Sequence, residues 1–182
     1  MSINQVKLFP PLRGVYVDLP KVPDPVFAEK MVGDGFAIDP LENVLYSPID
    51  GKIKSIHRAK HAITLESESG FDILIHIGLE TVSLGGKGFD VKVKEGQLVK
   101  VGDKLTEFDM DYIAGNVVAL ITPVLVTDME EKQISIEILP HDVITDLKQA
   151  IMLVTLGGEK VSPSAETNVA SAVASLESEL IT

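Results

Sequence analysis

Glycine and proline punctuate the chain as far as Leu125 at intervals of roughly 8–12 residues, and short apolar stretches lie between them. These stretches are rich in Val, Ile, Leu, Phe and Thr, which favour pleated strands over helices. Many short strands at this spacing predict an all-β fold that closes as an antiparallel, barrel-like β-sandwich with short helical turns. The predicted strands are 35–38, 43–46, 51–56, 62–66, 71–77, 90–93, 104–108, 117–121 and 125–127.

The region between 130 and 160 has a weaker pattern. Residues 133–139 alternate between apolar and polar side chains and predict a strand. Residues 142–150 are interpreted as a short helix, and 151–155 as a last strand.

The end of the chain changes character at Val161. Residues 161–182 contain neither a basic nor an aromatic residue and are dominated by Ser, Ala and Glu. We therefore divide the chain into a domain at 1–160 and an acidic tail at 161–182. An amphipathic C-terminal helix, docked on its own domain or on a partner, and a frayed tail remain alternatives. The helical interpretation depends on one apolar stripe formed by Val169, Val173, Leu176 and Leu180.

Composition excludes several function classes. The chain has 182 residues, about the length of one domain, and a net charge of −11 without a basic patch, which argues against a nucleic-acid partner. No apolar run approaches the roughly 20 residues that cross a bilayer, and the N-terminus lacks the pattern of a signal peptide. We therefore expect a cytoplasmic protein without membrane insertion. Because the chain has no cysteine, its 4 histidines are the side chains that titrate near neutral pH.

Two of these histidines fall on one predicted hairpin. The sequence from His61 to Gly78 contains two strands joined around Glu68-Ser69-Gly70, a composition typical of a tight turn. If Ser69 and Gly70 form the turn, Leu65 lies opposite Leu74, Ile63 opposite His76, and His61 opposite Gly78. Strand alternation then predicts that His61 and His76 lie on the same face as diagonal neighbours.

A pair of imidazoles on one face suits phosphoryl transfer. One neutral ring can attack phosphorus through one nitrogen while its other nitrogen donates to a fixed acceptor, and the second ring can donate to the phosphoryl oxygens. A single histidine on a strand is more often structural, which is the interpretation preferred for His57 and His141 taken alone. The competing role for two neighbouring histidines is zinc binding. A stable zinc site needs about four ligands, so we expect at most weak zinc binding at His61 and His76.

Several motifs in order then resemble the glucose-family enzyme IIA of the bacterial phosphoenolpyruvate–sugar phosphotransferase system. They are VPDPVFAEKMVGDGFAIDP (22–40), SPIDGKI (47–53), HAITLES (61–67), ILIHIGLETVSLGGKGF (73–89), VKEGQLVKVGDKLTEFD (93–109) and TPVLVTDM (122–129).

The resemblance implies a phosphotransferase without a required cofactor. His76 would accept a phosphoryl group from the phosphohistidine of the carrier HPr and pass it to a cysteine of a sugar-transporter IIB domain, and His61 would orient it. Two further possibilities stay open: binding of regulatory proteins, and a zinc site at His61 and His76 to which a partner adds a carboxylate ligand. We expect the backbone carbonyl of Gly78 to accept the inner N–H of His76. The other expected site residues line a shallow apolar depression with an acidic rim: Asp24, Val26, Phe27, Ile63, Leu74, Glu80 and Val82.

Three positions depart from the pattern expected of this family. Ala59 stands where a threonine is expected, and Thr64 or water would have to replace its hydroxyl. Glu80 replaces an aspartate, and His57 replaces an aromatic or apolar residue of the depression, as a third polar group or merely as a rim residue.

Three other classes of protein are alternatives. Glu95-Gly96 and Val101-Gly102-Asp103 resemble turns of biotinyl and lipoyl carrier domains, although those domains are shorter and lack a histidine pair. A non-catalytic binding or regulatory module is the second alternative. A zinc peptidase on a related scaffold would need His-x-His, where this chain has His76-Ile77-Gly78.

Overall fold

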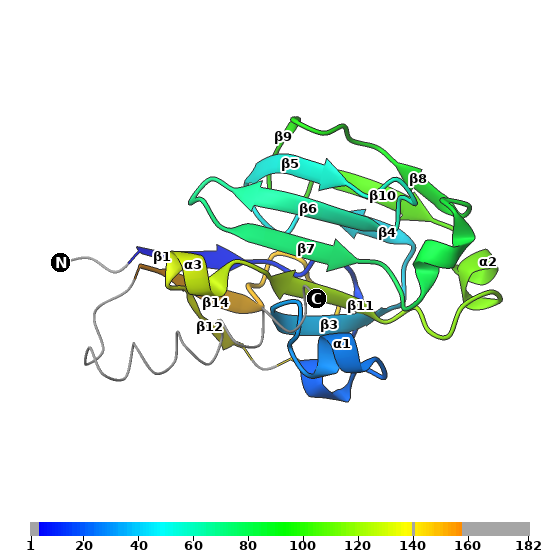
Figure 1. Ribbon diagram of the computed structural model, residues 1–182, viewed down its shortest axis with the longest axis horizontal. Coiled ribbons are helices and arrows are strands. Elements are labelled where there is room, and N and C mark those ends of the chain that lie inside the picture. Colours follow the sequence, from blue (N-terminus) through cyan, green and yellow to red (C-terminus); the bar gives the residue numbers. More distant parts are fainter. Residues whose placement is uncertain (1–3, 140, 158–182) are drawn as a thin grey trace.

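The computed structural model describes residues 4–139 and 141–157, so the predicted tail at 161–182 and its helix lie outside the described residues. The described chain is built from antiparallel strands and a few short helical turns, as predicted (Figure 1). No helix within these ranges is long and apolar enough to cross a membrane.

The largest sheet has eight strands in the order β13-β2-β3-β11-β7-β6-β5-β9, and every pairing in it is antiparallel. Its strands are β2 (Gly14–Val17), β3 (Asp34–Pro40), β5 (Gly51–Ile56), β6 (Ala62–Ser67), β7 (Asp72–His76), β9 (Leu98–Val99), β11 (Thr122–Val126) and β13 (Val143–Ile144).

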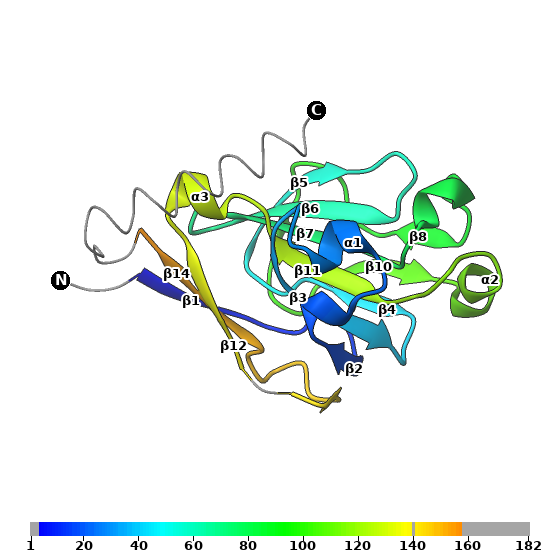
Figure 2. The same ribbon diagram turned by 60° about the horizontal axis from the view of Figure 1, so that its bottom comes forward.

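Two three-stranded sheets pack against this sheet (Figure 2). One has the order β4-β10-β8 and the other the order β1-β14-β12. Their strands are β4 (Val44–Tyr46), β8 (Phe89–Val91), β10 (Lys104–Phe108), β1 (Asn4–Leu8), β12 (Ser135–Ile138) and β14 (Met152–Leu156). The helical turns are η1 (Leu19–Lys21), α1 (Pro25–Ala28), η2 (Thr81–Leu84), α2 (Met110–Ala114) and α3 (Met129–Lys132).

The main core fills the space between the sheets. Alternating residues of β6 and β7, such as Ile63 and Ile75, meet Leu105 of β10 and Val154 of β14 in one buried cluster. A smaller cluster lies on the other face of the large sheet, where Phe27 of α1 and residues of η1 cover the strands. The large sheet is therefore covered on both faces near β7, and the small cluster lies on the face that bears His76.

Two predicted elements were wrong. Residues 117–121 form a loop with one isolated bridge, Leu79 to Ala119, and the strand begins at Thr122. Residues 142–150 contain the short strand β13 in place of a helix. The β-branched run Val143-Ile144-Thr145 favours extended backbone, and the Asp146 carboxylate then accepts the Lys148 N–H at 2.9 Å and closes a turn. Strands β1, β2 and β9 were not predicted.

Candidate active site

The hairpin of β6 and β7 differs from its predicted register by one residue. Its loop is closed between Ser67 and Phe71, where the Ser67 N–H donates to the Phe71 carbonyl at 2.8 Å. The loop thus has three residues and ends at Gly70 with a φ of 97°, a common arrangement when the last loop residue is left-handed. This odd loop length places Ala62 opposite His76, a position at which Ile63 was predicted.

His61 reaches His76 in spite of this shift. It lies just before β6 and follows Lys60, whose φ of 66° is left-handed, so strict strand alternation does not apply to it. Its ring lies 4.6 Å from the His76 ring, centroid to centroid, with the planes at 81°. The predicted contact between the two imidazoles is confirmed, although the predicted register was wrong.

The tautomer of His76 follows from one hydrogen bond. Nδ1 lies 2.8 Å from the carbonyl oxygen of Gly78. Because a carbonyl only accepts, Nδ1 carries the proton and donates it. The neutral ring then has an unprotonated Nε2, the nitrogen that can act as a nucleophile. The predicted contact with Gly78 is confirmed.

Burial keeps both rings neutral at pH 7. Together with the neighbouring His76 and His57, it lowers the pKa of His61 to about 4. Burial also lowers the pKa of His76, while the hydrogen bond to Gly78 and the negative charge of Asp24 oppose this effect. A neutral imidazole has a lone pair for attack, so this electrostatic environment suits a nucleophile.

One ring nitrogen of His61 is buried without a hydrogen-bond partner among the described residues. This atom is Nδ1, and the residue is only 3% exposed. The Thr64 hydroxyl therefore does not supply the hydrogen bond that was considered for it. An unpaired buried polar atom costs about 1–3 kcal/mol, so the orientation of this ring depends on its packing.

Apolar side chains flank His76. The Phe27 ring of α1 lies 5.0 Å from the His76 ring, and Leu74 packs in the same small cluster. Val26 and Val82 are 41% and 52% exposed, so their side chains are available to a partner.

The polar positions predicted around His76 have separate local roles. Asp24 caps α1, where its carboxylate accepts the Val26 N–H at 3.0 Å. Glu80 is exposed and precedes η2 with a left-handed φ of 61°. Asp24 lies close enough to His76 to affect the pKa of its ring, and Glu80 follows His76 by four positions in the sequence.

One expectation for the histidine site was wrong, and an alternative left open for His57 can be decided. Ile63 does not line the depression, because it lies opposite Ile75 and belongs to the main core on the other face of the sheet. His57 was predicted to be a third polar group near the site or merely a rim residue, and its ring lies 4.7 Å from that of His61. The pairing of β5 with β6 was the signal that could have placed His57 there.

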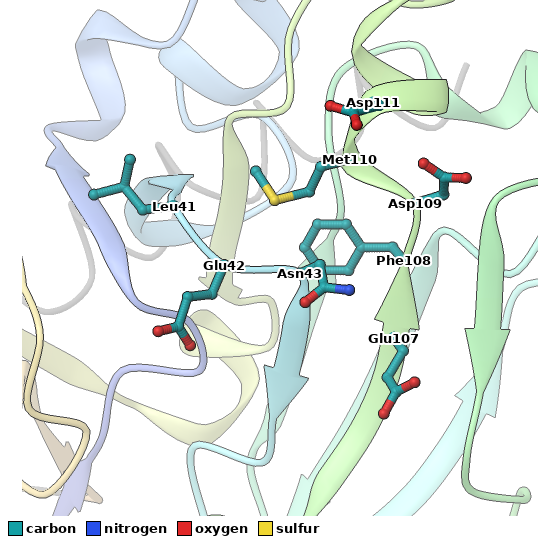
Figure 3. Close-up of a pocket in the computed structure, with 8 residues that line it drawn as sticks. All are labelled: Leu41, Glu42, Asn43, Glu107, Phe108, Asp109, Met110 and Asp111. Atoms are coloured by element: carbon teal, nitrogen blue, oxygen red, sulfur yellow. The ribbon is translucent and has the colours of Figure 1, made fainter.

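A groove elsewhere on the molecule does not belong to this site (Figure 3). It has a volume of about 700 Å³ and lies between the residues before β4 and the start of α2. Two of its four carboxylates are in ion pairs, Glu42 with Arg13 at 3.1 Å and Glu107 with Lys104 at 2.8 Å. Among the described residues, no group of three or more His, Asp or Glu side chains could hold a metal ion.

Comparisons with known proteins agree with the geometry of the histidine pair. Residues 6–132 match the family described as phosphoenolpyruvate-dependent sugar phosphotransferase system, EIIA 1. The chain is 45% identical over 130 residues to a glucose-specific EIIA component of Staphylococcus epidermidis, covering 71% of this chain and 78% of the relative. It is 47% identical over 127 residues to one of Bacillus cereus, covering 70% and 77%.

A solved structure extends this likeness to the fold. The glucose permease IIA of Mycoplasma capricolum matches with a TM-score of 0.74 and 34% identity, over 82% of this chain and 96% of that protein. The β-sandwich, the sequence identity and the family match lead to one conclusion: the chain belongs to the EIIA 1 family of the phosphoenolpyruvate-dependent sugar phosphotransferase system.

Proposed function

We propose that Nε2 of His76 is the atom that carries the phosphoryl group in this phosphocarrier of the sugar-uptake system. One observation supports this assignment above all others: the Gly78 carbonyl accepts the Nδ1–H of His76 at 2.8 Å and leaves Nε2 free. The N–P bond of the donor phosphohistidine breaks as a new N–P bond forms at Nε2. The donor imidazole keeps the electron pair of the broken bond.

His61 is the proposed donor to the phosphoryl oxygens. Phosphoryl transfer asks a protein for positioning and charge stabilisation rather than for covalent chemistry. The His61 ring stands edge-to-face against His76 and is neutral, so one of its nitrogens carries a hydrogen to donate. A phosphoryl group on His76 would raise the pKa of His61 and strengthen this donation.

Membership of the family implies an interaction with HPr and with a IIB/IIC transporter component. The exposed side chains of Val26 and Val82 are our candidates for the apolar contact with both partners. The acidic rim, with Asp24 and Glu80, suits partners whose contact surface is basic. Since the relatives are named for glucose, a glucose-transporter IIB domain is the first acceptor to test. The cytoplasm, where HPr is found, is the proposed location.

We also propose that transfer needs no metal. His61 and His76 could bind zinc weakly, or more tightly with a carboxylate from a partner, but neither proposed role requires an ion. As a separate proposal, the exposed face around Val82 is the candidate surface for regulatory targets.

The test is a reconstituted phosphorylation. The chain is incubated with phosphoenolpyruvate, enzyme I and HPr, and its intact mass is measured. We expect an acid-labile gain of one phosphoryl group in the wild type and none in His76→Gln. A gain in His76→Gln would overturn the assignment, and no gain in either protein would favour a non-catalytic binding module.

A further inference from the structure

A third imidazole lies in register with the pair. His57 follows β5, and its N–H donates to the Ala62 carbonyl at 2.9 Å, which continues the pairing of β5 with β6 by one position. Ala62 in turn lies opposite His76. Directly opposed residues of an antiparallel sheet share a face. His57, Ala62 and His76 therefore form one row across three strands.

The His61 ring lies between the two ends of this row. Two strand spacings separate the ends by about 9–10 Å. The His61 ring is 4.7 Å from the His57 ring and 4.6 Å from the His76 ring, tilted by 62° and 81°. Ala62, at the centre of the row, has only a methyl group and leaves space for this ring. His61 is thus held edge-to-face between two other imidazoles.

His57 is itself fixed by the backbone. The Ala59 N–H donates to its Nδ1 at 3.0 Å, and the Lys60 N–H donates to its carbonyl at 2.7 Å. His61 has no comparable bond at its own Nδ1. The backbone therefore anchors His57 and, through Gly78, His76, whereas the ring between them depends on contact with its neighbours.

We propose that His57 is a positioning residue for phosphoryl transfer: it holds the His61 ring against His76. This inference rests on the proposed roles of His61 and His76. The positioning effect depends on contact between the two rings. A phenyl ring at position 57 should therefore preserve the transfer rate, whereas the methyl group of alanine should not.

The experiment compares His57→Ala, His57→Phe and the wild type in single-turnover transfer to a IIB domain. We expect His57→Ala to slow transfer about 10- to 100-fold, the scale at which small misplacements act, with little change in the IIB concentration that gives half the maximal rate. His57→Phe should restore the rate to within about threefold. The control is His141→Ala, since His141 contacts the Leu139 carbonyl, away from the pair, and should leave the rate unchanged.

Proton NMR provides a second readout that does not depend on turnover. The ring protons of His61 should shift in His57→Ala, because the ring current of a neighbour is lost, and should remain displaced from random-coil values in His57→Phe. A His57→Ala protein with the wild-type rate overturns the proposal. So does a His57→Phe protein as slow as His57→Ala, which would assign the effect to a donated N–H. Phosphate uptake by His76→Gln would instead refute the proposed function itself.

Discussion

Replacing Gly78 with alanine should damage both the fold and the tautomer of His76. Gly78 has a φ of 75°, which costs a residue with a Cβ about 1–2 kcal/mol. A Cβ at this position would lie 2.7 Å from Thr81 Cγ2 and 3.1 Å from the Ala119 carbonyl oxygen. Crowding of this kind typically costs about 1–3 kcal/mol more, which gives a total loss of about 2–5 kcal/mol.

The control for this substitution is Gly70→Ala. Gly70 has a similar positive φ of 97°, but nothing lies within 4 Å of a Cβ built there. Gly70→Ala should therefore lower the free energy of unfolding only by the cost of backbone strain, about 1–2 kcal/mol. Urea unfolding of the two variants separates backbone strain from crowding, and Tm should fall by about 2–4 °C for each kcal/mol in a chain of this size.

Function should separate the two glycine variants more sharply. Movement of the Gly78 carbonyl would release the Nδ1–H of His76 and let the proton occupy Nε2, which would then lack a lone pair. We expect phosphorylation of Gly78→Ala by phospho-HPr to slow by about tenfold or more, with Gly70→Ala at the wild-type rate. Equal stability losses in the two variants, together with normal phosphorylation of Gly78→Ala, would refute the reasoning.

Three further predictions follow from the same site. His61→Gln should accept a phosphoryl group from phospho-HPr but pass it on slowly in a transfer assay, because one amide N–H does not reproduce the position of the ring; loss of acceptance would reverse the assigned roles. Acid should destabilise the fold through His61. Above pH 6.5 this ring is neutral in both the folded and the unfolded protein. As the pH falls toward the folded pKa of about 4, the unfolded protein binds the proton first, which favours unfolding. The loss approaches about 3 kcal/mol, measured by urea unfolding across pH, and His61→Gln should lack this part of the slope. Transfer should survive a strong chelator, and a loss that zinc restores would contradict the metal-free proposal.

The strands next to the histidines could be predicted because their sequences alternate clearly. Strands β5, β6, β7 and β10 were predicted at or near their observed bounds from apolar alternation between glycine-rich turns. The loop at 117–121 was misjudged because Val117-Val118 has the composition of a strand, yet only one isolated bridge forms there. Strand β1 was missed because its partner β14 lies at the other end of the described chain, a pairing that local pattern does not reveal.

The site shows why register is harder to predict than strand content. Whether Glu68-Ser69-Gly70 closes as a two- or three-residue loop depends on the Ser67 to Phe71 hydrogen bonds, and composition alone fits both. Ile63 was consequently assigned to the wrong face of the sheet. The contact of His61 with His76 survived this error because His61 lies outside the strand, after the left-handed Lys60. His57 required the paired register of three strands before its place beside His61 could be recognised.

The most direct test of the account is the nitrogen that bears the phosphoryl group. The protein, labelled with ¹⁵N in its histidine rings, would be phosphorylated through HPr and observed by proton–nitrogen and phosphorus NMR at neutral pH. The account predicts phosphorus coupled to Nε2 of His76, with the Nδ1 proton of the same ring still protected by the Gly78 carbonyl. Phosphorus on Nδ1 of His76, or on either nitrogen of His61, would contradict it.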